Sequence, residues 1–222
     1  MAVLAGPRRG PFALVVAAVL FAAVAADGWR WHLGALGDLA GAQSLWALGA
    51  FAFALLLSCG RIVPGVITGA AFGGLAIIAY YVYEWLAYDA HAAIAQLDRS
   101  GGPFWIAAAV LGGAVCGLLG AWAARTPSPR RLDPCALGWT FMAAVPIGEL
   151  AMVLPRRGSF GPGALVVPGL MMLVVAAALV VVGVRRAGWR RVGVAAAVVV
   201  VVAPILGLAF VAAELNFAYL TL

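Results

Sequence analysis

The stretch IVPGVITGAAFGGLAIIAYYVYEWLA, residues 62–87, decides the fold class, because Glu84 is its single charged side chain. A helix needs roughly 20 residues to cross a hydrocarbon core about 30 Å thick, and this stretch is long enough. No water is available inside a bilayer to satisfy the backbone, so a helix is expected here and not an isolated strand. We therefore predict a transmembrane helix over residues 62–87.

The rest of the chain has the same character. Of its 222 residues, 66% are hydrophobic and 10% are charged, whereas soluble domains are about half apolar and about a quarter charged. This composition excludes a soluble globular protein. It predicts an all-α polytopic membrane protein with about seven transmembrane helices, forming a single helical domain over residues 1–222. The seven apolar runs are residues 11–26, 45–59, 62–87, 102–124, 137–154, 164–184 and 192–219.

The arginines predict the orientation of these spans. All 14 basic residues are arginines, and cytoplasmic loops of membrane proteins carry an excess of basic residues. The charges fit an N-terminus inside and a C-terminus outside, with ten arginines in the inner segments and four in the outer ones. The inner arginines are Arg8, Arg9, Arg61, Arg125, Arg130, Arg131, Arg185, Arg186, Arg190 and Arg191, and the outer ones are Arg30, Arg99, Arg156 and Arg157.

Glycines recur at helical spacing in two consecutive runs. Gly65, Gly69 and Gly73 are four residues apart, and Gly113 and Gly117 repeat that spacing in the next run. Small residues so placed allow two helix backbones to approach closely. The pattern predicts that runs 62–87 and 102–124 pack against each other; a binding role for the glycines is the alternative interpretation.

Three glutamates are the candidate functional residues, because a carboxylate in hydrocarbon is costly and needs a partner, a proton or water. Glu84, Glu149 and Glu214 lie in the outer halves of three runs that all cross from inside to outside. They are therefore expected at a similar depth. Tyr80 and Tyr81 precede Glu84 by about one helical turn, so their hydroxyls are candidates to bond its carboxylate.

Two hypotheses follow for these residues. The first is an outward-facing polar cavity that binds or carries a small molecule, a cation or a proton; Pro146, which removes a backbone donor one turn before Glu149, favours a kink there. The second is structural: the glutamates are interfacial residues that snorkel or pair with outer arginines, in a scaffold component that packs with partner helices. A lipid-modifying intramembrane enzyme is a third, less supported alternative.

Signals for catalysis, metals and cofactors are absent from the sequence. His32 and His91 fall in outer loops without a hydrolase or metalloprotease motif. Cys59, Cys116 and Cys135 have no metal-ligand spacing and are expected to be free thiols. We expect no catalytic residue, no metal and no cofactor. The expected partner is the lipid bilayer, joined by a small-molecule ligand or other membrane subunits according to the hypothesis, and not nucleic acid.

Several segments together resemble a known family. These are ALGDLAGAQSLWALGAFAFALL (35–56), the glycine row followed by AYYVYEW (79–85), FWIAAAVLGGAVCGLLGAWAAR (104–125) and IGELAMVL (147–154). They resemble a family of uncharacterised multi-pass integral membrane proteins of bacteria. The resemblance implies an integral membrane protein and supplies no activity, substrate or functional residue. We expect the protein in a bacterial plasma membrane.

Overall fold

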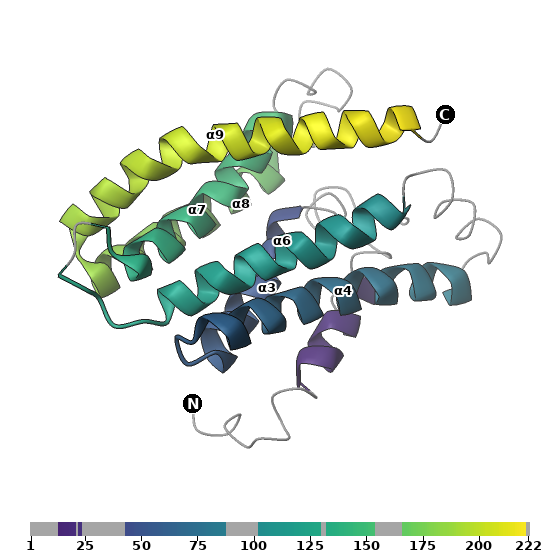
Figure 1. Ribbon diagram of the computed structural model, residues 1–222, viewed down its shortest axis with the longest axis horizontal. Coiled ribbons are helices and arrows are strands. Elements are labelled where there is room, and N and C mark those ends of the chain that lie inside the picture. The colour runs from purple at the N-terminus through teal and green to yellow at the C-terminus, as the bar shows by residue number, and fades with distance from the viewer. Residues whose placement is uncertain are drawn as a thin grey trace.

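The structure, a computed structural model, describes residues 13–20, 22–23, 43–87, 102–129, 132–153 and 166–220. These residues form helices and no strand, so the all-α prediction is confirmed for them (Figure 1). Residues 13–20 and 22–23 are helical and belong to the first predicted run. The long helices are α3 (Gln43–Leu57), α4 (Ile62–Ala87), α6 (Gly102–Ala123), α7 (Pro134–Val153), α8 (Val166–Ala187) and α9 (Trp189–Leu220).

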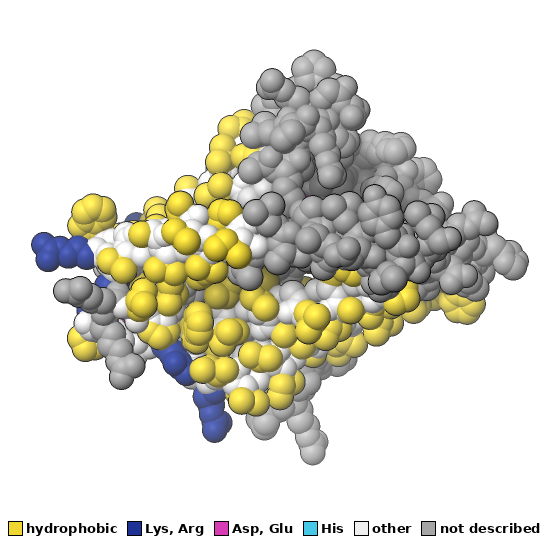
Figure 2. Space-filling view, turned by 45° about the horizontal axis from the view of Figure 1, so that its top comes forward, with side chains coloured by type: hydrophobic (Ala, Val, Ile, Leu, Met, Phe, Trp, Pro, Cys, Tyr) yellow, Lys and Arg dark blue, Asp and Glu magenta, His cyan; other side chains and the backbone are white. Residues whose placement is uncertain are grey.

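Within the described part of the chain, three helices are long and apolar enough to cross a membrane, by length and composition. They are Ile62–Ala87, Pro103–Ala123 and Gly169–Ala187, in α4, α6 and α8. The apolar helix α3 has only 15 residues, which is about 22 Å at 1.5 Å per residue and shorter than a hydrocarbon core of about 30 Å. Large apolar side chains are exposed along the helices (Figure 2), as expected of surfaces in contact with lipid.

Helix α6 is the centre of the bundle, and its most extensive partner is α4. The two backbones touch at their glycines. A Cβ atom added to Gly69 would meet the carbonyl oxygen of Gly113, and one added to Gly113 would meet that of Gly69. Gly117 stands in the same relation to the carbonyl oxygen of Gly65. The predicted packing of runs 62–87 and 102–124 is therefore confirmed.

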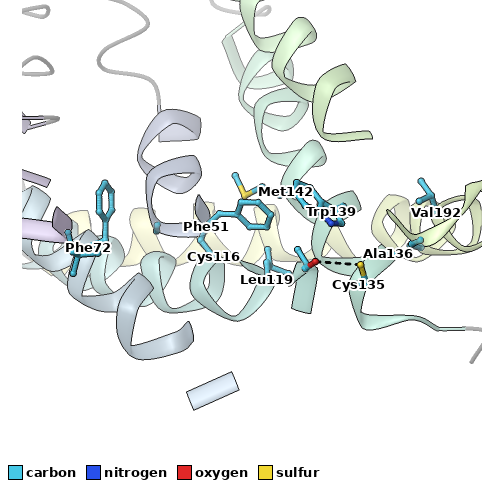
Figure 3. Packing of buried hydrophobic residues seen from close by; sticks show 14 of the residues in the cluster. Phe51, Phe72, Cys116, Leu119, Cys135, Ala136, Trp139, Met142 and Val192 are labelled. Carbon is cyan, nitrogen blue, oxygen red and sulfur yellow. Dashed lines mark hydrogen bonds between the residues drawn. The ribbon is translucent and has the colours of Figure 1, made fainter. Parts of the chain in front are cut away.

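Two further glycines bring α3 and α7 against α6. A Cβ on Gly120 would lie 2.5 Å from the carbonyl oxygen of Phe51 in α3, and one on Gly138 of α7 would meet that of Leu119. The core fills the space beside these contacts. The rings of Phe51 and Trp139 meet edge to face with centroids 5.3 Å apart (Figure 3). Through these two rings the hydrophobic core connects α3 with α7, and both helices also pack against α6.

The turns at one end of the bundle carry arginines. A tight turn joins α3 to α4, with the Arg61 N–H donating to the Ser58 carbonyl at 3.0 Å. Arg125, just after α6, donates from Nε to the Gly60 carbonyl at 3.0 Å. We call this the arginine end (Figure 2), and it holds all the arginines in the described part of the chain: Arg61, Arg125, Arg185, Arg186, Arg190 and Arg191.

Neighbouring glycines on α6 provide a test of the close packing. Gly113→Ala places a methyl group against the α4 backbone, so we expect the free energy of unfolding to fall by about 1–3 kcal/mol. Gly112→Ala is the matched control, because its Cβ would have nothing within 4 Å, and alanine favours helix by up to about 1 kcal/mol. Reversible unfolding in detergent micelles measures both changes. Equal effects of the two substitutions would contradict the packing described.

Candidate functional site

Glu149 of α7 binds the first turn of α3. The backbone N–H of Ser44 donates to Oε2 of Glu149 at 2.7 Å, across 105 residues of sequence. The first four N–H groups of a helix have no partner within the helix, and the positive end of the helix dipole favours an anion. Glu149 therefore caps α3 from a different helix.

The surroundings of Ser44 explain why α3 needs this acceptor. Ser44 is 2% exposed, so water cannot satisfy its N–H. A buried donor left unpaired costs about 1–3 kcal/mol, and a carboxylate is among the strongest acceptors available to it. Glu149, one of the three candidate acids, thus has a backbone partner.

Glu84 lies on α4 at the same end of the bundle, and it is 3% exposed. Tyr80, one turn before it, packs its ring 6.2 Å from that of Trp46 in α3 and 5.6 Å from that of Tyr81. Trp46 is two residues after Ser44, so the first turn of α3 contacts both Glu149 and the tyrosine that precedes Glu84 by one turn. We call this end, opposite the arginine end, the glutamate end; it is defined by Glu84 and Glu149.

The third glutamate is placed only in part. Glu214 belongs to α9, and its side chain lies outside the residues that the structure describes. His32 and His91 also lie outside them. The structure therefore brings Glu84, Tyr80 and Tyr81 to the same end as Glu149 and leaves the position of the Glu214 carboxylate a prediction.

A small hollow adjoins the bond between Glu149 and Ser44. Its volume is about 80 Å³ and it lies between α3, α7 and α8. Its lining is apolar, so it offers few partners for water or a cation; the polar cavity expected from the sequence stays a prediction. Pro146 lies on its wall, and α7 continues as a helix through this proline. The lining residues are Ser44, Leu45, Leu48, Pro146, Met171, Met172 and Val175.

Asp133 caps α7 at the arginine end, a role that the sequence reasoning missed. Its Oδ1 accepts the N–H groups of Cys135 at 3.3 Å and of Ser128 at 3.1 Å. It is 1% exposed, and its Oδ2 has no hydrogen-bond partner among the described residues. A signal was present, because Asp directly before Pro134 matches the preference for Asp at a helix cap and Pro at the first helical position.

The described residues contain no metal-ligand group. No three histidine, cysteine, aspartate or glutamate side chains come together among them. Cys59, Cys116 and Cys135 are free. Comparison with protein-family models, with curated proteins and with solved structures finds no match. The resemblance to uncharacterised bacterial membrane proteins accordingly stays an expectation.

Substitutions at Glu149 test the cap on α3. Glu149→Ala leaves the Ser44 N–H without this acceptor, so we expect the free energy of unfolding to fall by about 1–3 kcal/mol. Glu149→Gln keeps a neutral acceptor of similar size and should cost less than half as much. The two variants are compared with the wild type by reversible unfolding in detergent micelles.

The donor can be removed as well. Because it is a backbone group, only Ser44→Pro deletes it, and proline is tolerated in the first turn of a helix. Glu149→Ala should cost much less in the Ser44→Pro background than in the wild type. Strictly additive losses would show that the bond does not stabilise the fold.

Proposed function

We propose that the protein crosses the bacterial plasma membrane seven times, with its N-terminus inside and its C-terminus outside. Three helices of spanning length and composition support a membrane location. The gathering of all the described arginines at one end of the bundle supports a uniform orientation, because cytoplasmic ends carry the basic excess.

Within the membrane, we propose that the protein is a structural component and not a carrier. The observation that supports this function is the bond between Glu149 and the Ser44 N–H at 2.7 Å. Because this carboxylate caps a helix, it already accepts a hydrogen bond from within the protein. The apolar lining of the adjoining hollow gives a cation little reason to enter.

The outer surface supports packing with partner helices. Gly112 on α6, Gly148 on α7 and Gly193 on α9 have nothing within 4 Å of a Cβ position, whereas the glycines between α4 and α6 face backbone. Small residues with such open space allow a neighbouring transmembrane helix to approach closely. These helix positions are places where a partner helix would approach the described part of the chain closely.

One observation favours a second candidate function, the binding of a proton or a cation. Glu84 is 3% exposed, and acids buried in membrane helices often mark ion or proton sites. The tyrosine and tryptophan rings around the neighbouring Tyr80 would supply aromatic faces to a cation. Glu84, and not Glu149, is the residue on which this second function depends.

Glutamine variants separate the two functions. The full chain, with Glu84→Gln and Glu149→Gln as separate variants, is reconstituted into liposomes that contain a pH-sensitive dye, and retained ligands are identified by native mass spectrometry. For a structural component we expect no ligand other than lipid, and a proton flux equal to that of empty liposomes for all three proteins. Flux or a bound ligand that disappears in Glu84→Gln would establish the second function. Its disappearance in Glu149→Gln would overturn the structural assignment.

A further inference from the structure

Four arginines surround the turn between α8 and α9. The last turn of α8 contains Arg185 and Arg186, and the first turn of α9 contains Arg190 and Arg191. Gly188 alone separates the two helices and has φ +86°, a conformation that glycine adopts readily. The one-residue connection therefore holds four cationic side chains close together.

Three of these arginines extend into the surroundings of the protein. Arg185, Arg186 and Arg190 are exposed. Arg191 is half-buried and donates from an Nη atom to the Ala187 carbonyl at 3.3 Å, which completes the end of α8. Its guanidinium has further donors. The turn thus carries a cluster of positive charges. The hydrogen bond described within the fold involves only one of the four arginines.

The described acids do not neutralise this charge. Glu84 and Glu149 lie at the glutamate end, and Glu214 is 24 residues beyond Arg190 on α9, which is about 36 Å along the helix. Asp133 is the described acid at the arginine end; it is buried, and its Oδ1 caps α7. The first turn of α9 contains no acidic residue. The unmatched charge calls for an anion from outside the chain.

Apolar surface begins directly beside the arginines. Trp189, at the turn itself, is 74% exposed, and Val182 of α8 and Val194 of α9 are also exposed. Tryptophan favours the level of the lipid headgroups. A ligand that matches both features carries a negative headgroup and long apolar chains, whereas a free inorganic anion matches only the arginines.

The α3–α4 turn at the arginine end is a weaker candidate. Arg61 is exposed beside it, but Arg125 already donates to the Gly60 carbonyl. The α8–α9 turn therefore has more charge available to an external anion, and it also has the exposed tryptophan.

We propose that the α8–α9 turn binds the phosphate headgroup of an anionic phospholipid, whose acyl chains lie along the exposed apolar sides of α8 and α9. Arg185, Arg186 and Arg190 contact the headgroup oxygens. This site depends on the membrane location of the chain and is independent of the structural role proposed for Glu149. A docked anionic lipid would also fix the depth of both helices in the bilayer.

Lipid retention tests the proposal. The full-length protein is reconstituted into nanodiscs of phosphatidylcholine and phosphatidylglycerol, released in a mild detergent, and its retained lipids are counted by native mass spectrometry. We expect enrichment of phosphatidylglycerol over phosphatidylcholine. Arg185→Gln combined with Arg190→Gln should lower this enrichment about fivefold or more, since each arginine near an anionic surface contributes substantially to binding. Arg185→Lys combined with Arg190→Lys keeps the charge and should retain most of the enrichment.

Arg8→Gln combined with Arg9→Gln is the matched control. It removes the same formal charge from another pair of arginines predicted on the inner side, and it should leave the enrichment unchanged. An equal loss in this control would indicate diffuse attraction and overturn a local site. Unchanged enrichment in the Arg185/Arg190 glutamine variant would overturn it as well. Complete displacement of phosphatidylglycerol by inorganic phosphate, compared with chloride at the same ionic strength, would assign the turn to free anions and contradict the lipid assignment.

Discussion

The close approach of helix backbones to α6 is the constraint on which the other features depend. Lipid tails are as apolar as leucine side chains, so helices in a bilayer gain little from hydrophobic burial against each other and associate through close packing and polar contacts. Gly69 and Gly113 bring α4 onto α6, Gly120 brings α3 onto it, and Gly138 brings α7 onto it. Because α3 and α7 are both held against one helix, the first turn of α3 comes within hydrogen-bonding distance of Glu149.

The second constraint is that backbone N–H groups at a buried helix N-terminus need hydrogen-bond acceptors. Carboxylates supply such acceptors at both ends of the bundle. At the glutamate end, Glu149 accepts the N–H of Ser44 in α3. At the arginine end, Asp133 accepts the N–H of Cys135 in α7. The acceptor for α7 comes from the residue just before that helix, whereas the acceptor for α3 comes from another helix, which ties two elements together. An acid within an apolar helix is usually taken as a sign of transport or catalysis, but a buried helix start requires the same chemistry.

The sequence predicts what is encoded locally. Apolar runs and the four-residue glycine spacing identified the helices and the pairing of α4 with α6, because each signal lies within one or two neighbouring segments. The partner of Glu149 had no such signal: every residue except proline has a backbone N–H, and the contact spans 105 residues. The Asp133 cap was readable from the adjacent Pro134. The placement of Glu84 and Glu149 at the same end of the bundle followed from counting spans, and the apolar lining of the hollow depends on how α3, α7 and α8 meet.

The two ends of the bundle use charge in opposite ways, and the difference follows from side-chain length and geometry. A glutamate is short, so at the glutamate end it reaches only groups of neighbouring helices, and the buried N–H of Ser44 is such a group. Arginine has a long apolar stem and a delocalised charge, so it extends from a helix end to the lipid headgroups while its stem stays in apolar surroundings. Glu149 therefore acts within the fold, so its removal lowers the free energy of unfolding. The arginines of the α8–α9 turn instead contact lipid headgroups, so their removal changes which lipids the protein retains.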